Sequence, residues 1–451
     1  MRVPRAARRL SRSPQGRHGR GGASLPAQRA DRGLHRHGCE ARAPSLPGEV
    51  RDRGARRRRN GVLLLRPGRG LLLRGAAVLS TGIALVAGTA ILAYCNGSND
   101  VSKGIATLVG AGVAQYRRAV IWGAAWTLAG ALSAAVFSRA LVRTFSAGVV
   151  SAGGELSGPF AAAVLAGAIA WVLVATRAGL PVSTTHAITG ALCGAAVVAA
   201  GRDAVLWASL GPRVFLPLLV SPLLSLALFW ALYPALCFVV APLARRCACA
   251  EALPGEAAAA AGSSSAVLAA PAAVSLVVDH VENCRARGTA LAGIALPDAL
   301  HWLSSGLTSF ARGCNDAPKI VALGLVPGLG PDGGAARLFF AVSLAMAAGS
   351  LVAGRRVTET LSRRITPMNA VEGLSANLVT SLLVTLASSW GLPVSTTHVS
   401  AGAVAGLGLR RDARAVEWKT VWSVVQAWVV TLPACAALAG AAWWVLAGWA
   451  K

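Results

Sequence analysis

Acidic residues are scarce in this chain. Its 451 residues include 18 Asp and Glu against 44 Lys and Arg, and between Asp100 and Asp203 the single acid is Glu155. Charged residues make up 14% of the chain, well below the roughly 25% of a soluble domain, while hydrophobic residues make up 55%. This composition excludes an ordinary soluble globular protein and indicates a membrane protein.

The chain also lacks a paired cysteine framework and a nucleophile motif. Its nine cysteines show no pairing pattern, and Cys247-Ala248-Cys249, without nearby His or carboxylate ligands, is a weak signal for a soft metal. No Gly-x-Ser-x-Gly surrounds Ser183, so an intramembrane hydrolase using Ser183 and His186 is a remote alternative. We therefore expect no enzyme, no cofactor and no catalytic residue.

Apolar runs close to the length of a membrane-spanning helix recur along the chain. Each is long enough, or nearly so, to cross roughly 30 Å of hydrocarbon as a helix. The runs cover residues 75–94, 119–140, 160–175, 214–242, 338–353, 376–390 and 420–449, with a further span expected at 290–310. They predict an all-α polytopic membrane protein with roughly 10–12 membrane segments.

The first 70 residues are different. Residues 1–60 contain 17 Arg and four acids and show no apolar periodicity, which predicts disorder. A basic arm can bind anionic lipid or nucleic acid, and an Arg-rich start is also typical of a transit peptide. No Met occurs between Met1 and Met346, so we prefer a translation start near residues 62–78, which would leave this extension out. We assign it no function and no nucleic-acid partner.

Two motifs occur twice. Gly-Leu-Pro-Val-Ser-Thr-Thr-His, called the octapeptide below, runs from Gly179 to His186 and again from Gly391 to His398. A Gly-x-Asn-Asp-x-x-Lys motif precedes each copy, at residues 97–103 and 313–319. The copies are offset by similar amounts, 216 positions for the Asn residues and 212 for the His residues. A whole structural unit was therefore duplicated.

The duplication sets the predicted domain boundaries. Residues 1–70 are the extension, 71–244 the first repeat, 245–289 a linker, and 290–451 the second repeat. The linker contains Pro, Gly, an Ala run and Ser residues, with basic residues at both ends, so we expect it on the cytoplasmic side. Residues 274–282 are expected to form a short surface helix.

The octapeptide has the chemistry of an anion site. Pro181 ends any preceding helix, and Ser183 or Thr184 is an N-cap residue that would begin the next one. Free backbone N–H groups, hydroxyls and the positive end of the helix dipole suit a dehydrated oxyanion. A capping role at a packed interface is the alternative. Two copies facing one another at membrane depth favour the anion site.

The Asn-Asp motif supplies the opposite charge. Asp100 and Asp316, with amide and backbone oxygens, suit a hard cation such as Na⁺, or a carboxyl that carries H⁺. Lys103 and Lys319 lie one turn later and predict local ion pairs. The glycines between residues 97 and 112 predict a helix break. Arg312 would either help neutralise the anion or snorkel at the interface.

Together these motifs resemble the inorganic phosphate transporter (Pit-type) family of secondary carriers. The resemblance implies two homologous repeats of inverted topology with discontinuous helices and re-entrant hairpins, a site near mid-membrane, and a homodimer. It implies substrate contacts from Asn99, Asp100, Ser183, Thr184, Thr185, Asn315, Asp316, Ser395, Thr396 and Thr397. It places the coupling cation at Asp100, Asp316, Asn99 and Asn315, with no metal beyond Na⁺.

The sequence thus predicts a symporter of inorganic phosphate in the lipid bilayer of a plasma (bacterial inner) membrane. The coupling ion, Na⁺ or H⁺, stays open. A permease of sulfate or another oxyanion with the same architecture is the alternative, because neither motif contains a feature that counts substrate protons.

Overall fold

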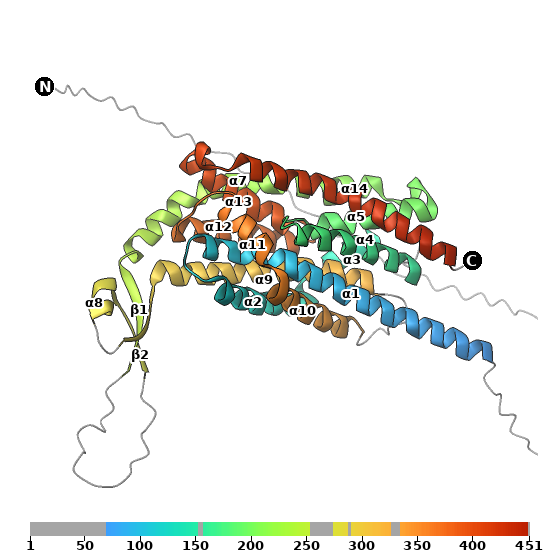
Figure 1. Cartoon of the computed structure of the whole chain (residues 1–451), viewed down its shortest axis with the longest axis horizontal. Helices are drawn as coiled ribbons and strands as arrows, with labels where there is room; N and C mark the ends of the chain where they lie inside the picture. Colours follow the sequence, from blue (N-terminus) through green and yellow to red (C-terminus); the bar gives the residue numbers. More distant parts are fainter. Residues whose placement is uncertain (1–68, 152–156, 253–273, 287–289, 326–333, 450–451) are drawn as a thin grey trace, which may run out of the picture. The chain divides into compact units, whose positions relative to one another are not determined.

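The protein is described here from a computed structural model that covers residues 69–151, 157–252, 274–286, 290–325 and 334–449. The basic extension lies outside the described residues, apart from its last two positions. The described part is mainly helical (Figure 1). The structure therefore agrees with an α-helical polytopic protein, apart from a small sheet described below.

The first half runs from α1 to a short 3₁₀ turn, η3. Its elements are α1 (Arg69–Gly110), α2 (Tyr116–Phe137), α3 (Arg139–Ala147), α4 (Gly158–Arg177), α5 (Thr184–Ala200), η1 (Arg202–Ala204), α6 (Trp207–Leu210), the π-helical turn η2 (Gly211–Phe215), α7 (Leu216–Val240) and η3 (Ala241–Leu243).

A joint and the second half follow. The joint contains β1 (Arg246–Ala252), β2 (Val274–His280), α8 (Val281–Ala286) and β3 (Ala290–Ala295). The second half contains α9 (Leu296–Gly324), α10 (Gly334–Ala353), α11 (Arg355–Arg363), α12 (Ala370–Ser389), α13 (Thr396–Arg411), η5 (Ala413–Ala415) and α14 (Trp418–Trp449).

The second half repeats the first, element by element. Helices α3 and α11 each have nine residues and begin 216 positions apart, which is the offset of the Asn-Asp motifs. Helices α4 and α12 each have 20 residues, and their offset of 212 matches the octapeptides. Helices α1 and α9 run in opposite directions, as do α7 and α14 (Figure 1). The predicted inverted topology is visible in these pairs.

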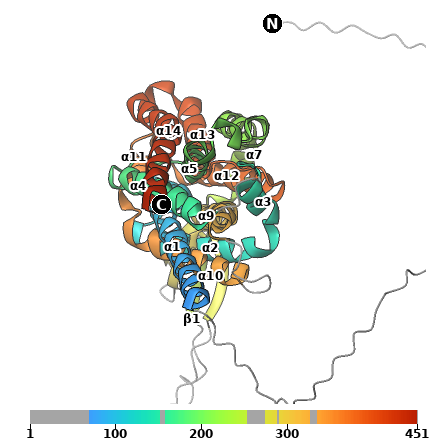
Figure 2. The ribbon, with the colours of Figure 1, turned by 90° about the vertical axis from the view of Figure 1, so that its right-hand side faces the viewer.

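Seven helices of the described part are long and apolar enough to cross a membrane. They include α1, α2, α4, α7, α10, α12 and α14, and they coincide with the seven apolar runs of the sequence. The further span expected at 290–310 is not among them: residues 290–295 form strand β3, and helix α9 (Leu296–Gly324) carries charged residues along its length. The end-on view shows helix α9 surrounded by other helices (Figure 2), and the side chains of Arg312, Asp316 and Lys319 are buried.

The two halves interleave through glycine contacts. A Cβ on Gly97 of α1 would lie 2.0 Å from the carbonyl oxygen of Met346 in α10, and one on Gly130 of α2 would lie 2.1 Å from that of Phe310 in α9. The same close approach joins Gly194 of α5 to Ala436 of α14. In each pair a first-half helix packs on a second-half helix, so the small residues permit backbone contact across the repeats.

The predicted helix break in the first Asn-Asp motif is wrong. Helix α1 continues through Gly97, Gly104 and Gly110 as one helix of 42 residues. Each of these glycines meets another element, and a Cβ on Gly104 would lie 2.1 Å from the hydroxyl oxygen of Ser309 in α9. The glycines therefore serve packing, which offsets their low helix propensity.

The described part of the joint contains a small sheet, and two predictions for it are wrong. Strands β1, β2 and β3 form an antiparallel sheet in the order β2-β1-β3. The stretch expected to form a surface helix is strand β2, whose residues alternate in exposure, as its Val-rich alternating pattern allows. Cys249 and Cys284 form a disulfide in this joint, although the cysteine spacing showed no pairing.

Candidate functional site

The first residues of each octapeptide terminate the preceding helix. Gly179 follows α4 with φ of 71°, a left-handed conformation that suits glycine, and Gly391 follows α12 with φ of 69°. The N–H of Leu180 then donates to the carbonyl of Ala175 at 2.9 Å, the bond of a Schellman C-cap. Pro181 cannot continue the helix, so the chain stays extended up to Ser183.

The last residues of each octapeptide begin the next helix. The hydroxyl oxygen of Ser183 accepts the backbone N–H of His186 at 3.3 Å, and that of Ser395 accepts the N–H of His398 at 3.2 Å. The serine of each copy is therefore the N-cap, of α5 and α13 respectively. The predicted order of helix stop, break and capped start is confirmed in both copies.

The two helix starts lie against one another. The Thr185 hydroxyl donates to the carbonyl oxygen of Val394 at 3.3 Å, and the Thr397 hydroxyl donates to that of Val182 at 2.8 Å. Each octapeptide thus binds the extended segment of the other through equivalent residues. The positive ends of α5 and α13 meet at one buried place between the halves.

The Asn residues support the breaks between the helices. The Asn99 amide donates to the carbonyl of Leu180 at 3.0 Å and accepts the N–H of Val182 at 3.1 Å. The Asn315 amide donates to the carbonyl of Val394 at 3.2 Å. Backbone groups that leave a helix inside a membrane need such partners. The structure therefore gives Asn99 and Asn315 a positioning role beside the predicted ligand role.

Two ion pairs flank the octapeptides. Lys103 pairs with Asp100, and Lys319 lies 3.3 Å from Asp316, with all four side chains buried. Both predicted pairs are confirmed. Lys319 also donates to the Thr185 hydroxyl at 2.7 Å and to the Val394 carbonyl at 3.1 Å, so positive charge reaches both octapeptides.

Asn96 joins the carboxylates of the two halves. Its amide nitrogen lies 3.1 Å from Asp100, 3.3 Å from Asp316 and 2.9 Å from the Thr184 hydroxyl oxygen. Asn96 was not among the residues predicted for the site. The sequence did contain a signal for it: Asn96 lies one helical turn before Asp100, and the equivalent position of the second repeat is the charged Arg312.

Arg312 is fully buried, so the expectation that it snorkels to the interface is wrong. It donates to the Thr127 hydroxyl of α2 and, at 3.3 Å, to that of Ser350 in α10. Its Nε and Nη1 have no hydrogen-bond partner within the described part of the chain. The other expectation, a positive charge available to an anion, is consistent with this burial.

All ten predicted substrate-binding residues come together at this place. Each is at most 4% exposed, and they come from α1, α9 and the two octapeptides. The set is Asn99, Asp100, Ser183, Thr184, Thr185, Asn315, Asp316, Ser395, Thr396 and Thr397. The structure thus joins residues separated by up to 298 positions in the sequence.

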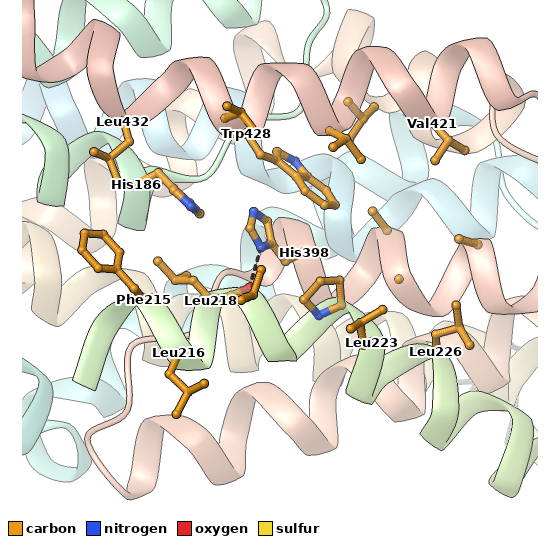
Figure 3. Close-up of a pocket in the computed structure, with 18 of the residues that line it drawn as sticks. His186, Phe215, Leu216, Leu218, Leu223, Leu226, His398, Val421, Trp428 and Leu432 are labelled. Carbon is orange, nitrogen blue, oxygen red and sulfur yellow. Dashed lines mark hydrogen bonds between the residues drawn. The ribbon is translucent and has the colours of Figure 1, made fainter. Parts of the chain in front are cut away.

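The octapeptide histidines point elsewhere. His186 and His398 lie with ring centroids 4.8 Å apart beside an apolar cavity of about 810 Å³, between α7, α13 and α14 (Figure 3). His398 Nδ1 lies 2.9 Å from the carbonyl oxygen of Leu218. Ser183 contacts the backbone of His186 through its capping bond, whereas the His186 ring faces His398. This arrangement gives no support to a Ser183–His186 catalytic pair.

Inverted repeats, two helix starts meeting at a buried centre and buried Asp–Lys pairs are the arrangement of a membrane transporter. Residues 96–439 match the Phosphate transporter family. The chain belongs to this family, which comprises transporters and permeases rather than enzymes.

Named relatives are consistent with this membership. The chain is 29% identical to "Inorganic phosphate transporter 2-1, chloroplastic" of Arabidopsis thaliana, with 78% of this chain and 70% of that protein covered. It is 28% identical to the "Probable low-affinity inorganic phosphate transporter" of Rhizobium meliloti (strain 1021), with 78% and 93% covered. A solved structure titled "The sodium-dependent phosphate transporter" shares the fold, with a TM-score of 0.64, 24% identity, and 82% and 99% covered.

Proposed function

We propose that the protein is a cation-coupled symporter of inorganic phosphate, with Na⁺ or H⁺ as the coupling ion. The observation that carries the proposal is the meeting of two equivalent helix N-termini beside the buried Asp100 and Asp316. Family membership and the names of the relatives support phosphate as the cargo. We place the protein in the plasma membrane, the inner membrane if it is bacterial, as a homodimer.

In this proposal the anion lies between the two octapeptides. Free N–H groups of the first turns of α5 and α13 and the hydroxyls of Thr184 and Thr396 donate to its oxygens. Ser183 and Ser395 keep their capping bonds and donate their hydroxyl protons to the anion. Lys319, which now bonds to Thr185 and Val394, supplies positive charge at the same place.

The coupling cation belongs at the carboxylates. Asp100 and Asp316 converge on the Asn96 amide from opposite halves, so a Na⁺ ion or a proton bound there lies next to the anion site. The charges of the two cargoes then compensate each other in a low-dielectric centre. Phosphate retains at least one proton where sulfate has none, so a carboxylate that accepts its hydrogen bond favours phosphate.

Uptake into proteoliposomes tests the proposal. We expect the reconstituted protein to accumulate radiolabelled phosphate faster when an inward Na⁺ or H⁺ gradient is imposed, and unlabelled sulfate to compete poorly. Liposomes without protein provide the background. Equal uptake of phosphate and sulfate would favour the oxyanion permease. A phosphate uptake rate that is the same with and without a Na⁺ or H⁺ gradient would refute coupling.

A further inference from the structure

The joint between the halves contains a cluster of three cysteines. Cys247 and Cys249 lie on β1 and Cys284 lies on α8, and their sulfur atoms all lie within 4.8 Å of one another. Cys249 is fully buried, and the other two are 7% exposed. The cluster lies outside the transport site and takes no part in the proposed symport.

Local structure explains why the three sulfurs meet. Residues 247 and 249 are two apart on a strand, so their side chains leave the same face of the sheet. Cys284 approaches that face from α8, with its sulfur 3.7 Å from the Cys247 carbonyl oxygen. On β3, Gly293 is opposite Cys249, and a Cβ there would lie 3.3 Å from the Cys247 sulfur and 3.7 Å from the Cys249 sulfur. The glycine leaves this side of the cluster without a side chain.

A disulfide accounts for only part of the cluster. It joins Cys249 to Cys284, and the free sulfur of Cys247 lies 3.6 Å from that of Cys249. Three thiolates that bind one ion at about 2.3 Å each have sulfurs roughly 3.8–4.0 Å apart. The 3.6 Å between the Cys247 and Cys249 sulfurs is close to this spacing, and all three sulfurs lie within 4.8 Å of one another. Once the Cys249–Cys284 bond is reduced, those two sulfurs are no longer held at bonding distance and can separate to form a three-sulfur ligand set.

We propose that, when reduced, Cys247, Cys249 and Cys284 bind one thiophilic d¹⁰ metal ion, Zn²⁺ or Cu⁺. Thiolates are the ligands that such ions prefer, and three of them leave one position open or complete a trigonal site. The basic ends of the joint, Arg245 and Arg246 among them, indicate the cytoplasmic side. Thiols are kept reduced there.

Loading of the metal ion takes two steps, reduction of the disulfide and binding of the ion. A cellular dithiol reduces the Cys249–Cys284 bond by thiol–disulfide exchange, in which the dithiol becomes a disulfide and the two cysteines gain two electrons and two protons. The metal ion then displaces one proton from each of the three thiols, so binding releases three protons. The disulfide is the metal-free, oxidised form of the same cluster.

Metal titration of the full-length protein tests the proposal. The reduced, detergent-purified protein is titrated with Zn²⁺, with Cu⁺ and with Cd²⁺ as a spectroscopic probe, whose thiolate charge-transfer band reports sulfur ligation. We expect one ion per chain. Cys247→Ser, Cys249→Ser and Cys284→Ser should each lose stoichiometric binding. Cys237→Ser, a half-buried cysteine of α7 outside the cluster, should keep it.

The Cys247→Ser variant separates this proposal from a simple disulfide. A structural disulfide needs only Cys249 and Cys284, so loss of Cys247 would leave it unaffected, whereas a three-sulfur site needs all three. Undiminished binding in Cys247→Ser, or no stoichiometric binding by the wild-type protein, would overturn the proposal.

Protection from alkylation gives a second readout that needs no variant. Bound Zn²⁺ should protect the three cysteines of the reduced wild-type protein from iodoacetamide, as measured by mass spectrometry. Equal alkylation of these cysteines with and without Zn²⁺ would also overturn the proposal.

Discussion

Single polar residues in the centre of this protein have two roles: they stabilise the fold through buried contacts, and they belong to the proposed binding site. Asp100 contacts Lys103 and Asn96, so it neutralises a buried cation as well as facing Asp316 across the Asn96 amide. A substitution of Asp100 alone therefore mixes two effects. It leaves the buried Lys103 without a counter-ion, which costs about 3–5 kcal/mol, and it removes the carboxylate that we assign to the coupling ion.

A charge-neutral pair of substitutions separates these effects. We predict that Asp100→Asn abolishes gradient-driven phosphate accumulation and lowers thermal stability. In Asp100→Asn/Lys103→Met the stability loss should be smaller, because no unpaired cation remains, but accumulation should stay absent, because an amide cannot carry H⁺ and holds Na⁺ weakly. Proteoliposome uptake and thermal unfolding measure the two effects. Wild-type accumulation by the double variant would show that Asp100 serves only the ion pair.

Side-chain contacts were predictable from the sequence where the two residues lie close together along the chain. The serine caps and the two Asp–Lys pairs depend on residues three positions apart on one helix, and sequence spacing predicts such contacts. The bonds of Asn99 to the first octapeptide and the burial of Arg312 among α2 and α10 depend on how distant helices pack. The sequence could not predict these contacts, because spacing along the chain does not determine them.

At the scale of helices, glycine positions determine how closely the elements approach. Seven apolar runs became helices, as expected, because length and hydropathy suffice to identify a span. The glycines of α1 were interpreted as helix breakers, since an isolated sequence does not show the neighbouring backbone that each of them contacts. Strand β2 was missed for a related reason, because its pairing partner β1 lies beyond a stretch of more than 20 residues.

Two glycines of the same helix test this interpretation. In Gly97→Ala the new methyl group would lie 2.0 Å from the Met346 carbonyl oxygen of α10, whereas in Gly82→Ala it would meet nothing within 4 Å. We predict that Gly97→Ala lowers the free energy of unfolding by about 1–3 kcal/mol. Gly82→Ala should leave it unchanged or raise it by up to about 1 kcal/mol, the helix-propensity gain.

Thermal unfolding in one detergent compares these two variants under equal conditions. Because both replace a helical glycine of α1 by alanine, the propensity term cancels in the difference between them. A Gly97→Ala protein as stable as Gly82→Ala would contradict the close crossing of α1 and α10.

At the scale of the whole molecule, the duplication produces one site rather than two. The octapeptides bind each other through the hydroxyls of Thr185 and Thr397, and helices of one half pack on helices of the other. The duplication was predictable from the matched offsets in the sequence, and its inverted topology from the resemblance to the Pit-type carriers. The interleaving was not, because repeated motifs are equally compatible with two separate bodies that meet at a plane.

The central claim is that both octapeptides hold one phosphate ion, and phosphate binding to threonine variants tests it most directly. The measurement compares the wild-type protein with Thr184→Val, Thr396→Val and the double variant, because valine keeps the shape and removes the donor. Each lost donor should cost roughly 1–3 kcal/mol, or about 5- to 150-fold in phosphate affinity, with little loss of protein.

The double variant reports whether the two threonines share a ligand. Substitutions around one ion are coupled, so we predict that the loss of affinity in the double variant differs from the product of the single losses by more than the roughly 0.3–0.5 kcal/mol of independent sites. Phosphate affinity that is unchanged in both single variants, or losses that simply multiply, would contradict a single site shared by the two halves.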